Sequence, residues 1–90
     1  MKKLVKVEEV ENEGLIGLMG QKITLFCCNY FYTGTLVGVN DDFCKLEDAA
    51  IVYETGALDT PDWKDAQRLP NDLYVMKQSI ESFCVLKVTL

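Results

Sequence analysis

The spacing of apolar positions changes near residue 20, from helical intervals to short runs that are typical of strands. Over residues 10–19, apolar side chains recur at helical spacing, with acidic residues near the start that suit a helix N-terminus, which predicts a short helix. Gly14 and Gly17 each destabilise this helix by about 1 kcal/mol relative to alanine, so packing against the rest of the domain must support it. Gly20 is suited to end the helix.

Five later runs are rich in β-branched and aromatic residues, which predicts strands. The second run contains Gly34 and Gly38, which remove side chains where a strand bends sharply or passes close to another backbone. Sharp bending of a central strand is a feature of small barrels. The predicted strands span residues 22–28, 30–39, 43–54, 73–77 and 83–88.

The connections between these runs are polar. Residues 40–42 form a turn by composition. The longest connection, residues 55–72, contains both prolines, and Thr60 followed by Pro61 predicts the start of a helical turn over residues 61–69. This connection also contains Trp63, whose ring we expect to pack on the domain's own surface.

Length and composition indicate one globular domain that spans residues 1–90, since 49% of the residues are hydrophobic and 26% are charged. A chain this short buries a small share of its surface, so association with other copies is an expected source of stability. No apolar run approaches the ~20 residues that span a bilayer, and charges interrupt the apolar stretch that a signal peptide needs. We therefore expect a cytoplasmic protein with no membrane partner.

The charge balance bears on the choice of partner. The formal net charge is −5, and Arg68 is the single arginine. Proteins that hold duplex DNA through many phosphate contacts need a concentrated basic surface, because counterion release supplies most of that affinity. Duplex DNA is therefore not an expected partner, although a ring of subunits could still concentrate a few lysines around its axis.

The cysteines are expected to be buried, reduced thiols rather than a metal or redox site. Each lies in an apolar, strand-like run, and the side chains of two adjacent cysteines in a strand point to opposite faces. The chain has no histidine and no Cys-x-x-Cys spacing, so we expect no metal and no cofactor. An enzyme is not expected either, because a Gly-rich phosphate loop and a serine in a nucleophile context are also missing. The four cysteines are Cys27, Cys28, Cys44 and Cys84.

Four segments together carry a pattern that is known from one family of small β proteins. They are Leu18-Met19-Gly20-Gln21-Lys22-Ile23-Thr24-Leu25, Tyr32-Thr33-Gly34-Thr35-Leu36-Val37-Gly38-Val39-Asn40, Leu46-Glu47-Asp48-Ala49, and Met76-Lys77-Gln78-Ser79-Ile80-Glu81-Ser82. In this order they resemble the Sm and Sm-like (LSm) family. The first resembles the end of the helix and the start of the first strand, and the next two resemble the centre and the close of the first Sm motif.

The fourth segment is similar to the Tyr-Lys-His-Ala-Ile-Ser-Thr segment of the bacterial host-factor RNA chaperone, with Lys77 at the lysine and Gln78 at the histidine. The chain departs from the eukaryotic pattern in three places. Asn40 replaces an aspartate, the Arg-Gly pair of the second motif is missing, and the segment between Asn40 and Leu46 is one residue shorter. Asp42 and Phe43 therefore lie nearest to the family's base-contacting Met-Asn pair.

The resemblance implies a mainly β, Sm-like fold: a short N-terminal α-helix followed by a strongly bent, five-stranded antiparallel open barrel. It also implies a homo-oligomeric ring of about five to seven subunits, in which the fourth strand of one copy pairs with the fifth strand of the next. An open barrel leaves two unpaired edges, and exposed apolar edges are templates for association. The candidate interface residues are Leu73, Tyr74, Val75, Met76, Phe83, Cys84, Val85 and Leu86.

The resemblance further implies binding of short single-stranded RNA near the pore. Phe43 could stack on a base, Asn40 and Gln78 could read its edge, and Lys77 could meet a phosphate. The candidate RNA-binding residues are thus Asn40, Asp42, Phe43, Lys77 and Gln78. A purely structural alternative stays open, with Phe43 in the core and residues 40–42 as a simple turn.

Two functions remain open from the sequence. The first is a ring that binds single-stranded RNA. The second is a ring-shaped protein-assembly scaffold without nucleic acid, which the acidic balance and the missing Arg-Gly pair favour. Asp41 and Asp42 would repel phosphate around such a ring.

Overall fold

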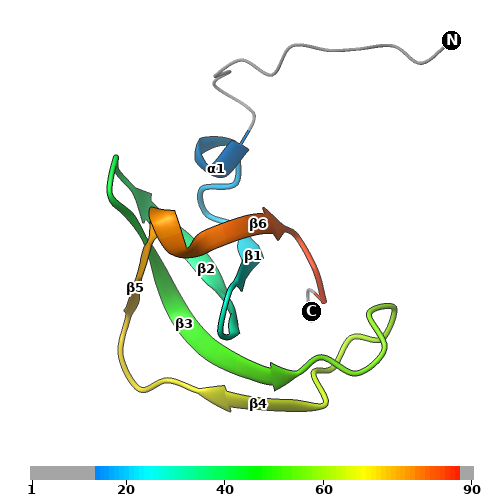
Figure 1. The fold of residues 1–90 in the computed structure, drawn as a ribbon. Helices are drawn as coiled ribbons and strands as arrows, with labels where there is room; N and C mark the ends of the chain where they lie inside the picture. Colours follow the sequence, from blue (N-terminus) through cyan, green and yellow to red (C-terminus); the bar gives the residue numbers. More distant parts are fainter. Residues whose placement is uncertain (1–13, 88–90) are drawn as a thin grey trace, which may run out of the picture.

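The structure is a computed structural model that describes residues 14–87. These residues form one sheet of six antiparallel strands together with a short helix, so the chain is mainly β, as predicted (Figure 1). The third predicted strand is confirmed with the same bounds. The elements are α1 (Gly14–Gly17), β1 (Lys22–Cys27), β2 (Phe31–Val39), β3 (Phe43–Glu54), β4 (Asp65–Arg68), β5 (Leu73–Met76), the 3₁₀ turn η1 (Lys77–Ser79) and β6 (Ile80–Cys84).

The strand order is β4-β3-β2-β1-β6, and β5 also pairs with β3. The long strand β3 curves through the fold, so its first half pairs with β5 and its second half with β4 (Figure 1). Strands β4 and β5 therefore follow one another along the edge of β3 that faces away from β2, with a break at residues 69–72. The sheet does not close, because no pairing within residues 14–87 joins β6 to β4 or β5.

Strands β2 and β3 bend together at Gly34. The register between them shifts at this point, and β3 contributes one extra residue, where Asp48 has a φ of 50°. A Cβ atom at Gly34 would lie 2.9 Å from the Glu47 carbonyl oxygen, so glycine is needed for the two backbones to approach this closely. The predicted bend is confirmed here. At Gly38 a Cβ would make an ordinary 3.5 Å contact, so that glycine is not required by space.

The hydrophobic core lies between the bent strands. Alternate side chains of β1 point into it, since successive residues of a strand face opposite sides. Leu15 and Leu18, from α1 and the turn after it, pack against this core from outside. The buried members are Ile23, Leu25, Cys27, Leu36, Cys44, Leu46, Ala49 and Val75.

The expected burial of the cysteines is correct for two of the four. Cys27 and Cys44 are buried, and desolvation by this burial raises the pKa of both thiols. Cys84 is half-buried, whereas Cys28 is exposed at the end of β1, where the strand gives way to a turn. The expectation of four buried thiols is therefore wrong for Cys28.

Two elements differ from the sequence prediction. The predicted helix of residues 10–19 is observed only as α1, since residues 10–13 lie outside the described part and the chain turns after Gly17. Within residues 14–87, no helix is long and apolar enough to cross a membrane. The helical turn predicted over residues 61–69 is wrong, because β4 occupies this region and pairs with β3. Tertiary pairing has overridden the local signal of an N-cap followed by proline.

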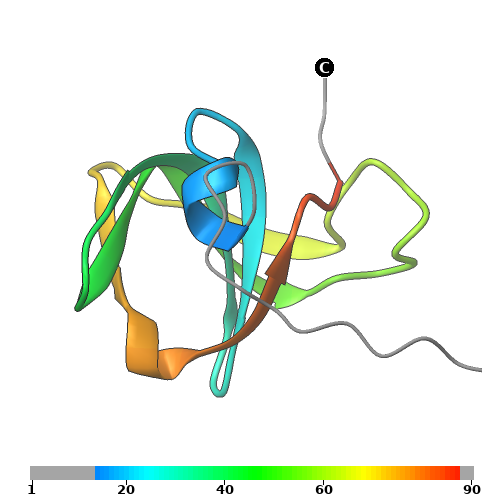
Figure 2. The same ribbon diagram turned by 90° about the horizontal axis from the view of Figure 1, so that it is seen from above.

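The last predicted strand is also displaced. β6 begins at Ile80, earlier than expected, and ends at Cys84, while residues 85–87 leave the sheet. Both views place the end of this segment beside the loop of residues 55–64, which joins β3 to β4 (Figures 1 and 2). Residues 88–90 lie outside the described part.

Candidate nucleic-acid interface

The loop between β2 and β3 is shaped by the side chain of Asn40. Its Oδ1 atom accepts hydrogen bonds from the backbone N–H groups of Asp42 and Phe43, each at 2.8 Å. The backbone N–H of Asn40 also donates to the Phe43 carbonyl oxygen at 3.0 Å. This arrangement is an Asx turn, which confirms the predicted turn. Since Oδ1 is used within the loop, the Nδ2 group is the part of Asn40 that remains for a ligand.

This loop is joined to the corner η1. The backbone N–H of Lys77 donates a hydrogen bond to the Asp42 carbonyl oxygen at 2.9 Å. The pairing of β5 with β3 leads directly to this contact, because its last pair is Phe43 with Met76. The structure therefore brings Asp42, Phe43 and Lys77 together.

Phe43 is half-buried and packs on an exposed aromatic side chain. Its ring meets the ring of Tyr74 edge to face, with centroids 5.2 Å apart and an interplanar angle of 89°. Tyr74 is 56% exposed, and the Nζ atom of Lys45 lies 5.6 Å from the centre of its ring. The structural alternative in which Phe43 is a core residue is thus not supported, because Phe43 is absent from the buried cluster.

Lys45 is a member of this surface that the sequence prediction missed. Its Nζ atom lies 3.5 Å from the Asp72 carboxylate, and Tyr74 and Asp72 together raise the pKa of its ammonium group. Lys45 lies at this surface because the register between β3 and β5 pairs it with Tyr74. That register depends on a long-range pairing, which no local pattern of the sequence fixes.

Lys77 and Gln78 have different surroundings. The Lys77 side chain is half-buried and close enough to Cys44 for its positive charge to oppose the rise in that thiol's pKa. Gln78 is exposed and lines a hollow of about 450 Å³. One side of the hollow is formed by Cys28, Asn29 and Tyr32, and the other by Gln78, Ser79 and Glu81.

This hollow is in the size range of small-molecule sites. Among residues 14–87, no lysine or arginine lines it, and the Glu81 carboxylate would repel a phosphate group. Amide and hydroxyl groups on its walls suit an uncharged polar group, such as the edge of a nucleobase. Of the residues predicted to bind RNA, Gln78 alone lines it. The remaining residues that line the hollow were not predicted, because they come from segments that are separate in the sequence.

The predicted interface residues divide into two groups. Tyr74, Met76 and Val85 are exposed, whereas Val75 is 5% exposed and belongs to the core. Alternation along β5 explains this division, since neighbouring residues of a strand face opposite sides. The Val75 side chain therefore faces the core, so Val75 can take part in the predicted interface only through its backbone. Leu73 and Phe83 pack against the core, Cys84 and Leu86 are half-buried, and Val85 and Leu86 lie beyond the end of β6.

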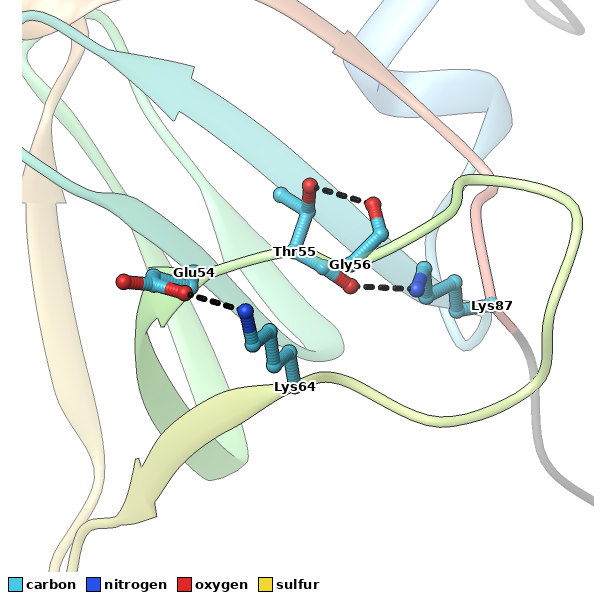
Figure 3. Close-up of polar contacts among 5 residues, drawn as sticks. All are labelled: Glu54, Thr55, Gly56, Lys64 and Lys87. Carbon is cyan, nitrogen blue, oxygen red and sulfur yellow. Dashed lines mark hydrogen bonds and ion pairs between the residues drawn. The ribbon is translucent and has the colours of Figure 1, made fainter.

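Within residues 14–87, three of the lysines are engaged in ion pairs or buried. Lys45 pairs with Asp72, and Lys64 pairs with Glu54 at 3.3 Å (Figure 3). Lys87 is 8% exposed. At the joined loop and corner, Lys77 is the basic residue for which residues 14–87 show no ion pair.

No protein-family model matches the chain, and no curated protein matches it.

Proposed function

We propose that this chain is an Sm-like subunit that assembles into a homo-oligomeric ring and binds short single-stranded RNA near the central pore. The observation that carries the proposal is the hydrogen bond from Lys77 to the Asp42 carbonyl. It joins the two segments to which the family resemblance assigns RNA contact. A stacking residue and a basic residue thereby belong to one surface.

The unpaired edges of β5 and β6 support the proposed ring. Strands β5 and β6 each pair along one edge, with β3 and β1 respectively, and their other edges have no partner within residues 14–87. Unpaired edges with exposed apolar side chains, here Tyr74 and Met76, favour pairing with another chain. A head-to-tail contact of β5 with β6 of the next copy repeats until the ring closes.

β5 is a better edge for this contact than β4. All four residues of β4 are exposed, and its two end residues, Asp65 and Arg68, are charged. Charged side chains on an edge strand oppose pairing with another strand. β5 has no charged residue and is four residues long, against five in β6. The two open edges are thus similar in length.

The side chains at the joined loop and corner support the proposed RNA binding. A base stacks on the aromatic pair of Phe43 and Tyr74, and the Lys77 ammonium meets a phosphate. Gln78 contacts the edge of one base at the hollow. The Nδ2 group of Asn40 can donate a hydrogen bond to the edge of another base. Because Lys77 is the one cation without an ion pair that residues 14–87 place at this loop and corner, each site is weak, and repetition around a ring supplies the affinity.

Fluorescence anisotropy with labelled U-rich and A-rich oligonucleotides tests the proposal. We expect Lys77→Ala to weaken binding by roughly tenfold at low salt, because it removes a phosphate contact from every subunit. Lys64→Ala is the matched control, since Lys64 is an exposed lysine engaged with Glu54. If the assembled wild type binds neither oligonucleotide at low salt, RNA binding is excluded.

A ring-shaped protein-assembly scaffold is the second candidate function. Three observations favour it: Asn40 Oδ1 is occupied by the turn, the Phe43 ring packs on Tyr74, and Asp42 is exposed beside Lys77. A ring of such loops would present negative charge around its axis. This function requires a wild type that assembles but does not bind RNA. Fluorescence anisotropy on the assembled wild type distinguishes it from the RNA-binding ring.

A further inference from the structure

The end of the described chain is held by one buried side chain, Lys87. Its Nζ atom donates hydrogen bonds to the carbonyl oxygens of Thr55 and Asp62, at 2.5 and 2.7 Å, and to the Thr60 hydroxyl at 3.3 Å. The same atom lies 4.9 Å from the centre of the Trp63 ring, which confirms that this ring packs within the domain. The ammonium group thus uses its three donors and meets an aromatic face.

These acceptors lie near both ends of the loop of residues 55–64. Within the loop, Lys64 donates its backbone N–H to the Thr55 carbonyl, and its side chain pairs with Glu54 (Figure 3). Lys87 reaches this loop from the segment after β6, and Figure 3 shows its bond to the Thr55 carbonyl. One side chain therefore fastens the connection between β3 and β4 to the end of the chain's last strand.

The contacts of Lys87 coincide with an end of β6 that comes earlier than the sequence predicts. The sequence pattern predicts a strand through residue 88, but strand pairing stops at Cys84. Lys87 has a φ of 54°, which a strand does not allow. The Thr24 hydroxyl also donates to the Leu86 carbonyl at 3.4 Å. The sequence pattern predicts a strand over residues 85–87, yet tertiary bonds from Lys87 and to Leu86 accompany their departure from the line of β6.

We propose that Lys87 is an autoinhibitory latch that limits the edge offered to a second copy of this chain. With the latch engaged, β6 has five residues. When Lys87 leaves its acceptors, residues 85–87 extend β6 and lengthen the open edge. In an antiparallel contact the added residues run past the start of the partner's β5, towards the residues that join it to β4. This inference rests on the proposed ring, in which β6 pairs with β5 of a neighbour.

Lys87→Met tests the latch, because methionine keeps an unbranched apolar stem and removes the three donors. We expect the Trp63 fluorescence to shift to longer wavelength as the loop opens. We expect the protein concentration at half-assembly, from light scattering across a dilution series, to fall by about tenfold. Lys64→Met is the matched control, since this exposed lysine lies at the same loop and its side chain pairs with Glu54 rather than with the acceptors of Lys87. It should leave both readouts unchanged.

Hydrogen exchange separates the latch from the ring. In the assembled variant, the backbone N–H groups of residues 85–87 should gain protection relative to the assembled wild type. A Lys87→Met protein that assembles at the same or a higher concentration than the wild type overturns the latch and leaves the ring intact. A wild type and a variant that both stay monomeric, with the Trp63 shift present, overturn the ring and with it the inhibitory role of Lys87.

Thr60→Val covers the case in which Lys87→Met does not fold. This change removes one of the three acceptors and leaves the two carbonyl contacts in place. A smaller shift of half-assembly in the same direction, about threefold, supports the latch. A shift in the opposite direction overturns it.

Discussion

Asp42 and Lys77 are joined by a 2.9 Å hydrogen bond from the Lys77 backbone N–H to the Asp42 carbonyl oxygen. Because both partners are backbone atoms, the contact depends on strand pairing and not on the identity of either side chain. The strand pair of Phe43 with Met76 lies next to this hydrogen bond. Side chains in the loop and the corner can therefore be replaced to test function while this junction is kept.

Gly34→Ala should destabilise the fold by about 2 kcal/mol, since the added methyl group meets the Glu47 carbonyl oxygen at 2.9 Å and backbone atoms cannot easily yield. Gly38→Ala is the matched control in the same strand, because its Cβ makes an ordinary 3.5 Å contact. Urea denaturation followed by circular dichroism measures both free energies of unfolding. Equal losses for the two variants would contradict the close approach at Gly34.

Asn40→Ala should lower the free energy of unfolding by about 1 kcal/mol, because two backbone N–H groups lose their acceptor. Asn40→Asp keeps an acceptor oxygen in the same place and should cost less than half as much. Thermal and urea denaturation provide the comparison. A larger loss for the aspartate variant would show that the acceptor oxygen is not what Asn40 contributes.

The sequence predicted the strands well where their apolar residues alternate against one core. β3 was placed with the correct bounds, and the bend at Gly34 was expected from the missing side chain. β4 could not be predicted, because Asp65-Ala66-Gln67-Arg68 has no strand pattern and is extended only by its pairing with β3. The early end of β6 likewise coincides with hydrogen bonds from Lys87 to acceptors in a distant loop, which no local pattern of the sequence predicts.

Only part of the candidate site could be predicted, because contacts between distant segments depend on strand pairing. Family resemblance selected Asp42, Phe43 and Lys77, and these do lie together. Lys45 and the walls of the hollow were missed, since their proximity arises from strand register and from a corner between β5 and β6. Local patterns predict elements, whereas such contacts depend on how the elements pair.

Cys28 should react with a thiol reagent much faster than Cys27 and Cys44 in the native protein. Cys28 is exposed, whereas burial of the other two raises the pKa of their thiols and lowers the fraction of reactive thiolate. Mass spectrometry after brief labelling near neutral pH counts the modified thiols, and Cys28→Ser should remove the fast phase. Fast labelling of Cys27 or Cys44 in Cys28→Ser would contradict the burial of these two thiols.

The stability of the fold should decrease at alkaline pH. The folded-state pKa values of Cys27 and Cys44 are raised above the ordinary value of 9.0, so unfolding releases protons once the pH reaches that range. The stabilising contribution is complete below the unfolded pKa and is lost as the pH rises through the folded values. Tyr32 adds to this loss above its ordinary value of 10.0. Melting temperatures between pH 7 and pH 10 test the slope.

Met76→Lys should weaken self-association by at least about tenfold if β5 is the edge that meets another copy, because a charge there must be desolvated on pairing. Met76 is 45% exposed on β5, so the monomer should tolerate the change and keep its melting temperature. Leu58→Lys is the matched control, since Leu58 is 57% exposed in the loop between β3 and β4 and belongs to neither β5 nor β6. Light scattering across a dilution series gives the half-assembly concentration of each. A Met76→Lys protein that assembles like the Leu58→Lys control would exclude β5 from the contact, and β4 would then be the edge to test.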